Sequence, residues 1–126
     1  MPTSRQTALE AALISDEHKV EKIRIPDLRK LFVSDYFVVG TIVNRHHGRA
    51  VAEGMTEALK KRGEKPLGVS GVEEGSWVLI DLGDVVIHLF EEQFRKYYDL
   101  EGLWGDAPKV AFKSPKPAVK RARASR

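Results

Sequence analysis

The feature that most constrains the fold of this chain is a pair of apolar, β-branched runs separated by a short turn. The runs are 77–81 (WVLID) and 85–90 (VVIHLF), and residues 82–84 (LGD) lie between them. Runs of this length are typical of strands, and a Gly-Asp turn between them favours a tight hairpin. Upstream, 35–43 (DYFVVGTIV) is almost continuously apolar, which predicts a strand buried on both faces. The sequence therefore predicts a β-sheet that contains a hairpin.

Helical periodicity places helices around these strands. An apolar stripe at four-residue spacing predicts a helix over 3–18, and a similar pattern predicts one from Ala50 to the basic run before Gly63. Between the second strand and that helix we expect a polar break at 44–48. Short strands are expected at 20–25 and 67–69, and a last helix is expected to begin near Glu91. This order predicts a single α/β domain with a mixed β-sheet flanked by helices.

Charge is distributed unevenly along the 126 residues. Residues 109–126 carry seven basic groups and no acidic one: Lys109, Lys113, Lys116, Lys120, Arg121, Arg123 and Arg126. The whole chain has 21 basic and 18 acidic groups, so residues 1–108 hold 14 basic and all 18 acidic ones, a net charge of −4. We therefore expect a mildly acidic folded domain at 1–108, followed by a basic, disordered tail at 109–126.

Composition excludes several classes of protein. The chain has no cysteine, which rules out disulfides and thiol catalysis. No run approaches the roughly 18 to 20 apolar residues that cross a bilayer. Residues 1–19 lack the apolar block of a secretory signal, and Glu10, Asp16 and Glu17 argue against a transit peptide. We expect a cytoplasmic protein that makes no membrane contact.

Asp81 and Asp84 are the strongest candidates for catalysis. A nucleotidyltransferase holds Mg²⁺ with clustered carboxylates, normally from an Asp-x-Asp on one strand face. Asp81 and Asp84 are instead three residues apart across a turn, and Asp-x-Gly-Asp is also the composition of a hairpin turn. We favour a structural or interface role, and the alternative is a divergent nucleotidyltransferase or nucleotide-binding protein that uses both carboxylates.

Other catalytic signatures are missing from the sequence. His46 and His47 are adjacent, His18 is isolated and His88 lies in an apolar strand, so no metal-ligand spacing occurs. There is no Walker loop, no GxGxxG and no Gly-x-Ser-x-Gly elbow. We therefore expect no metal, no cofactor and no enzymatic activity.

Aromatic residues gather in the last third of the sequence. Trp77, Tyr97, Tyr98 and Trp104 are interleaved with acidic side chains, which is the composition of a binding hot spot. Their spacing is equally compatible with a place in the core. The sequence leaves both interpretations open.

Two long segments resemble a known family. Residues 77–90 resemble the signature strand pair of the Iojap-like ribosomal silencing factors, and 95–104 (RKYYDLEGLW) is similar to the closing segment of that family. Upstream, 35–39 (DYFVV) and 66–69 (PLGV) follow in the family's order. The resemblance covers about residues 6–107, and it implies a fold like that of nucleotidyltransferases without their active site.

The resemblance also implies a function by steric occlusion. Members bind the large ribosomal subunit through the ribosomal protein numbered fourteen, at the face that meets the small subunit, and so prevent joining of the subunits and repress translation. An acidic, aromatic-rich surface would complement a basic ribosomal protein. Our hypothesis is that the contact residues are Trp77, Tyr98 and Leu100 as buried anchors, with Asp81, Glu101 and His88 orienting or pairing with basic groups.

Two further partners are expected from charge and exposure. The basic tail either contacts ribosomal RNA through its phosphates or only adds solubility. An exposed strand or aromatic patch would permit a homodimer away from the ribosome.

Overall fold

The computed structural model describes residues 3–31, 34–97, 102, 105 and 107–114. The elements within these residues are α1 (Ser4–Glu17), β1 (Glu21–Arg24), β2 (Tyr36–Ile42), α2 (Arg45–Lys61), β3 (Gly68–Ser70), β4 (Trp77–Asp81), β5 (Val85–Glu91) and α3 (Glu92–Tyr97), with a 3-10 turn at Arg29–Leu31. The predicted order of helices and strands is confirmed. None of the described helices is long and apolar enough to span a membrane.

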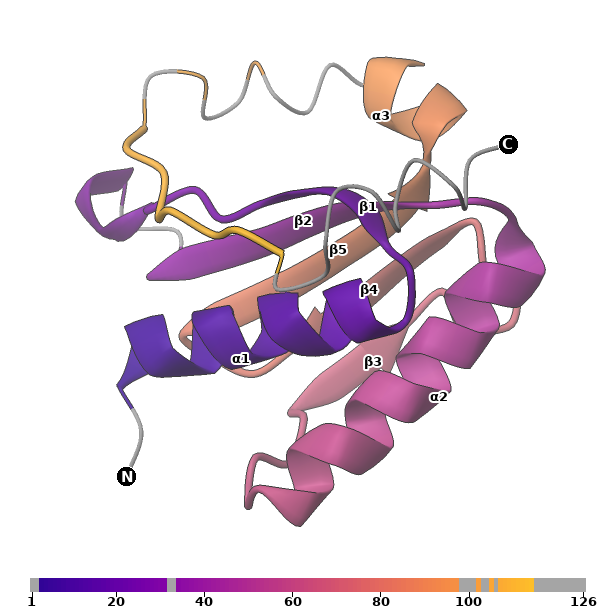
Figure 1. The fold of residues 1–126 in the computed structure, drawn as a ribbon, viewed down its shortest axis with the longest axis horizontal. Coiled ribbons are helices and arrows are strands. Elements are labelled where there is room, and N and C mark those ends of the chain that lie inside the picture. The colour runs from indigo at the N-terminus through magenta and orange to yellow at the C-terminus, as the bar shows by residue number, and fades with distance from the viewer. Residues whose placement is uncertain (1–2, 32–33, 98–101, 103–104, 106, 115–126) are drawn as a thin grey trace.

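The strands form one mixed sheet in the order β1-β2-β5-β4-β3 (Figure 1). The predicted hairpin is β4–β5, which aligns Trp77 with Phe90 and Asp81 with Val86. β2 and β5 are parallel and form the middle of the sheet, whereas the other neighbouring pairs are antiparallel. The structure therefore confirms a single α/β domain with a mixed sheet. The likeness to nucleotidyltransferases stays a prediction.

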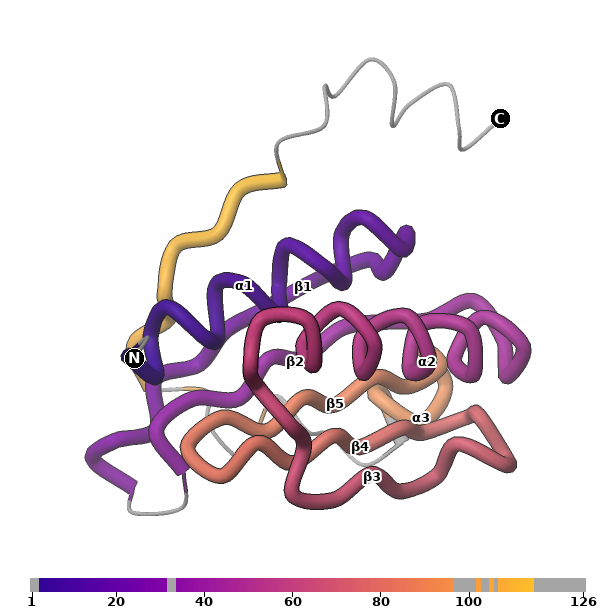
Figure 2. The backbone as a smooth tube through the Cα atoms, turned by 90° about the horizontal axis from the view of Figure 1, so that it is seen from below, coloured from indigo at the N-terminus to yellow at the C-terminus, as the bar shows by residue number. Residues whose placement is uncertain are grey.

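The two long helices lie on the same side of the sheet (Figure 2). Because side chains alternate along a strand, Val38 of β2 with Ile87 and Leu89 of β5 join the main core beneath these helices. Val39 and Phe90 point to the other side, where they form a second buried cluster with Leu28. We call the side turned away from α1 and α2 the second face.

The predicted polar break at 44–48 was wrong, because α2 begins at Arg45 rather than near Ala50. The Asn44 side chain caps the helix by accepting a hydrogen bond from the His47 backbone N–H, 2.9 Å away. The first turn of the helix is polar because Asn44 and His47 make hydrogen bonds at the helix start instead of packing into the core.

Two residues of this turn fix the position of α2. The His47 Nδ1 accepts from the Val43 N–H at 2.9 Å, and its Nε2 donates to the His18 carbonyl oxygen at 2.7 Å. A Cβ on Gly48 would overlap the carbonyl oxygen of Gly75. The start of the helix thus packs directly against the loop before β4.

The last described segment, 108–114, lies along the domain and is called the strap here (Figure 1). The Asp27 N–H donates to the Pro108 carbonyl at 2.7 Å, and the Val110 N–H donates to the Ile25 carbonyl at 2.8 Å. Val110 is 7% exposed. The strap therefore extends the β1 side of the sheet.

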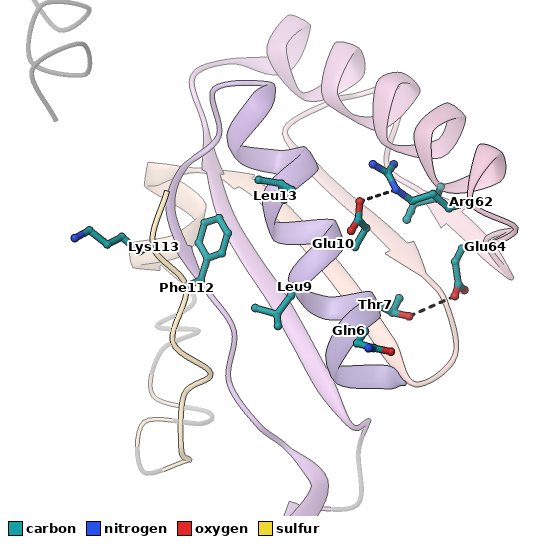
Figure 3. Close-up of a pocket in the computed structure, with 10 residues that line it drawn as sticks. Gln6, Thr7, Leu9, Glu10, Leu13, Arg62, Glu64, Phe112 and Lys113 are labelled. Atoms are coloured by element: carbon teal, nitrogen blue, oxygen red, sulfur yellow. Dashed lines mark hydrogen bonds and ion pairs between the residues drawn. The ribbon is translucent and has the colours of Figure 1, made fainter. Parts of the chain in front are cut away.

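Further along, the strap runs beside α1 (Figure 3). Phe112 packs against the main core, and the Ser114 hydroxyl donates to the carboxylate of buried Asp16 at 2.7 Å. The folded part of the chain thus continues at least six residues past the predicted boundary at residue 108. Val110 and Phe112 are the apolar residues that make this possible in a basic segment. Residues 115–126 lie outside the described residues, so disorder there stays a prediction.

Candidate partner-binding face

Three of the six expected contact residues lie on the second face. Trp77 and Asp81 occupy alternate positions of β4 on this face, and His88 of β5 pairs with Leu79 between them. The structure brings Trp77 and His88 together, with ring centroids 6.5 Å apart. Asp81 lies at the opposite end of β4, roughly 13 Å away at the rise of an extended strand. All three side chains are half-buried.

An aromatic group surrounds His88. The Phe37 ring lies 4.5 Å from the His88 ring, and the Trp77 ring lies 5.3 Å from that of Phe90, each pair tilted by about 55°. Tilted contacts at these distances are favourable for aromatic rings. Phe90 is fully buried, whereas Phe37 and Trp77 are half-buried and keep apolar surface at the solvent boundary. We call Phe37, Trp77, His88 and Phe90 the aromatic cluster.

His88 is a neutral member of this cluster. Burial lowers the pKa of its imidazole from 6.5 to about 4, because the charged form is poorly solvated there. Its Nε2 is buried and has no hydrogen-bond partner within the described part of the chain. At neutral pH the cluster therefore carries no positive charge of its own that would repel a basic partner.

The turn geometry explains Asp81 and Asp84. The Asp81 Oδ1 accepts from the Gly83 N–H at 2.8 Å, and Gly83 has the positive φ of 92° that such a turn requires. The Asp84 carbonyl oxygen accepts from the Asp35 and Tyr36 N–H groups. Among the described residues, no group of three or more His, Asp or Glu side chains could hold a metal ion. These contacts favour the structural role.

The remaining expected contact residues, Tyr98, Leu100 and Glu101, lie outside the described residues, as does Trp104. Their roles stay predictions. The sequence interpretation missed Phe37, although it stands at an alternate position in the 35–43 run. In a run that is apolar on both faces, alternation alone does not tell which side chains face the helices.

A separate cavity of about 710 Å³ lies over the outer side of α1 (Figure 3). Leu9, Leu13 and Phe112 give it an apolar wall, as Figure 3 shows beside the strap. An ion pair between Glu10 and Arg62 borders the cavity. None of the described contact residues lines this cavity, so the candidate site and the cavity are distinct.

A mixed sheet with two helices on one side and half-buried aromatic rings on the other defines a small single-domain α/β protein with a distinctive sheet surface. The model of the family described as ribosomal silencing factor during starvation matches residues 1–126. The chain belongs to the ribosomal silencing factor family, as the resemblance had indicated.

Two of the similar proteins match this chain over most of its length. A ribosomal silencing factor from Halalkalibacterium halodurans is 35% identical over 109 residues, which cover 85% of this chain and 93% of that protein. A crystal structure of a Bacillus halodurans protein superposes with a TM-score of 0.74 and 31% identity, covering 85% of this chain and 99% of that one. A mouse protein named mitochondrial assembly of ribosomal large subunit protein 1 is 33% identical over 82 residues, 63% of this chain and 35% of the mouse protein.

Proposed function

We propose that this chain binds the large ribosomal subunit through the ribosomal protein numbered fourteen and sterically blocks joining of the small subunit, which represses translation. Membership of the ribosomal silencing factor family over residues 1–126 carries the proposal. The name of the mouse relative, which refers to the large subunit, supports the choice of subunit. Occlusion needs a docking surface and no reacting group.

The second face supplies that surface in the proposal. Trp77 presents a large half-buried ring beside His88, and aromatic rings of this kind are frequent anchors of protein interfaces. Asp81 adds a carboxylate at the far end of β4, and residues 1–108 carry a net charge of −4. An aromatic face on a mildly acidic domain complements a basic ribosomal protein. We propose Tyr98, Leu100 and Glu101 as further contacts.

The nucleotidyltransferase alternative gains no support from the site. One carboxylate oxygen of Asp81 is held by the turn, and Asp84 contributes its backbone carbonyl to the end of β2. Magnesium-dependent nucleotide binding by the purified chain would reopen it.

Contact with ribosomal RNA and formation of a homodimer belong to the same proposal. Residues 115–126 would reach ribosomal RNA, since five of the seven basic groups of the predicted tail lie there. Homodimerisation would occur away from the ribosome, and the compartment would be the cytoplasm.

Sedimentation of the tagged protein with large subunits, small subunits and joined ribosomes tests the proposal. We expect the protein to travel with free large subunits and to suppress joined ribosomes when small subunits are added. Trp77→Ala should weaken the complex by about 30-fold, the equivalent of about 2 kcal/mol for a central aromatic anchor. Leu67→Ala, which removes a 76% exposed side chain beside β3, is the control. Full activity of Trp77→Ala would remove Trp77 from the interface, and absence of large-subunit binding would overturn the proposal.

A further inference from the structure

A buried guanidinium joins α3 to three strands of the sheet. Arg95 is 7% exposed, and its Nη1 donates to the Thr41 hydroxyl at 2.7 Å and to the Lys22 carbonyl oxygen at 3.0 Å. The guanidinium carbon lies 5.9 Å from the centre of the Phe90 ring. Lys22, Thr41 and Phe90 belong to β1, β2 and β5 respectively. One side chain therefore ties the helix to three of the five strands of the sheet.

Glu92 completes this arrangement, which we call the α3 clamp (Lys22, Thr41, Glu92 and Arg95). The Glu92 carboxylate accepts from the Lys22 ammonium at 2.8 Å and from the Thr41 hydroxyl at 3.4 Å. The Thr41 hydroxyl thus donates to Glu92 while it accepts from Arg95. The Lys22–Glu92 pair is solvent-exposed, so it adds little stability. Arg95 is the buried centre of the clamp.

The orientation of α3 depends on such tertiary contacts. A six-residue helix is far shorter than the roughly 12 to 15 residues that an isolated helix needs to be marginally stable in water. Phe94 supplies an apolar contact, because it packs against the second buried cluster that Trp77 also touches. Apolar contact is non-directional, whereas the hydrogen bonds that Arg95 makes to the described Thr41 and Lys22 fix direction.

Stability alone does not account for a buried guanidinium. Taking a charge out of water is costly, and replacement of a buried ionic group by a well-packed apolar one is often neutral or stabilising. What an apolar side chain cannot supply is a nitrogen such as Nη1, whose N–H groups meet acceptors on two different strands. The geometry therefore suits a role in placing α3.

We propose that Arg95 is a positioning residue of the docking face, which holds α3 so that Phe94 lies against the same buried cluster as Trp77. The inference rests on the proposed function, because it assigns Phe94 to the surface that meets the ribosome. The sensitivity is geometric. A tilt of about 20° about the start of α3 moves the backbone at Phe94 by about 1 Å and the end of the roughly 9 Å helix by about 3 Å, which changes the surface that the helix offers to a partner.

Affinity for the large subunit, measured for a set of matched variants, tests this role. Arg95→Met keeps an unbranched apolar stem and removes the donors, and we expect it to weaken binding about 10-fold at a temperature where circular dichroism shows it folded. Lys96→Met changes an exposed neighbour on the same helix and should stay within 2-fold. Thr41→Val removes one acceptor of Arg95 and keeps the guanidinium charge. This variant replaces Arg95→Met in the test if Arg95→Met does not fold.

A double-mutant cycle separates positioning from general stabilisation. If Arg95 acts through Phe94, Arg95→Met should change affinity less than 2-fold in a Phe94→Ala background. Additive losses, or a folded Arg95→Met with unchanged affinity, would overturn the inference. If the unmodified protein does not bind large subunits, the proposed function fails by itself. In that case the NMR chemical shifts of the Phe94 amide and the Trp77 indole test the positioning role. Shifts that change in Arg95→Met but not in Lys96→Met support the role, and unchanged shifts in Arg95→Met overturn it.

Discussion

His88 makes the stability of this small domain depend on pH. Its imidazole lies against Phe37 and Trp77, and burial lowers its pKa from 6.5 to about 4. Unfolding restores the ordinary value. Between pH 6.5 and about 4 the unfolded chain therefore binds more protons, so the contribution of His88 is fully present above pH 6.5 and is lost as pH falls through this window.

Replacing His88 tests this dependence. We expect His88→Leu to flatten the fall in unfolding free energy between pH 6.5 and 4, where His88 contributes up to about 3 kcal/mol at 1.36 kcal/mol per pKa unit. Urea denaturation at a series of pH values measures it. His46→Asn, at an exposed position in α2, should leave the slope unchanged. An unaltered slope in His88→Leu would mean that other groups carry the acid sensitivity.

At Gly48 the backbone of α2 lies so close to Gly75 that the usual preference of helices for alanine over glycine is reversed. In an exposed helix, Gly→Ala stabilises by about 1 kcal/mol. At Gly48 the new Cβ would overlap the Gly75 carbonyl and press on Ile42, so we expect Gly48→Ala to lower the free energy of unfolding by about 2 kcal/mol. The control is Gly68→Ala in β3, where the Cβ meets open space. Equal stability of the two variants would show that the loop before β4 yields easily.

The strap is the element whose importance is easiest to underestimate from its composition. Ending the chain after Pro108 removes the burial of Val110, its hydrogen bond to Ile25 and the contact of Ser114 with Asp16. Burial of one Val and two hydrogen bonds together suggest a loss of roughly 2 to 4 kcal/mol. A chain that ends after Ser114 should match the full chain in urea denaturation. If both truncations are equally stable, the strap contributes no net stability.

Elements with a strong apolar pattern could be predicted, and those shaped by polar contacts could not. The hairpin and β2 follow from their β-branched runs. The start of α2 could not be predicted in this way, because Asn44 and His47 act through hydrogen bonds rather than through apolar periodicity. The candidate site could be predicted only in part. Alternation along β4 places Trp77 and Asp81 on one face of the sheet. Phe37 in β2 and Arg95 in α3 could not be assigned to this site, because they are distant from β4 in the sequence.

At the scale of the whole molecule, charge divides between a mildly acidic domain and the basic residues 115–126. We expect deletion of 115–126 to keep large-subunit binding, because the proposed contacts lie in the domain. The slope of log affinity against log salt should become less steep by up to roughly 0.7 to 0.9 for each of the five basic groups that meets a phosphate.

A shuffled tail of the same composition is the control, because counterion release does not depend on sequence. It should restore the slope of the intact chain. Loss of binding on deletion would instead favour an RNA-binding protein led by its tail. The deletion must spare 109–114, since removing the strap would confuse folding with binding.

The strand order also has a consequence for how the protein is made. β5 is the last of the described strands, yet it lies in the middle of the sheet, and it pairs Val85 with Tyr36, 49 positions earlier. Contacts between such distant positions form late because loop closure must precede them. During synthesis, β2 therefore waits for its central neighbour until most of the chain exists. A nascent chain acquires its second face only after β5 has been made, so under the proposed function a copy still being translated would have no finished surface with which to engage the ribosome that is making it.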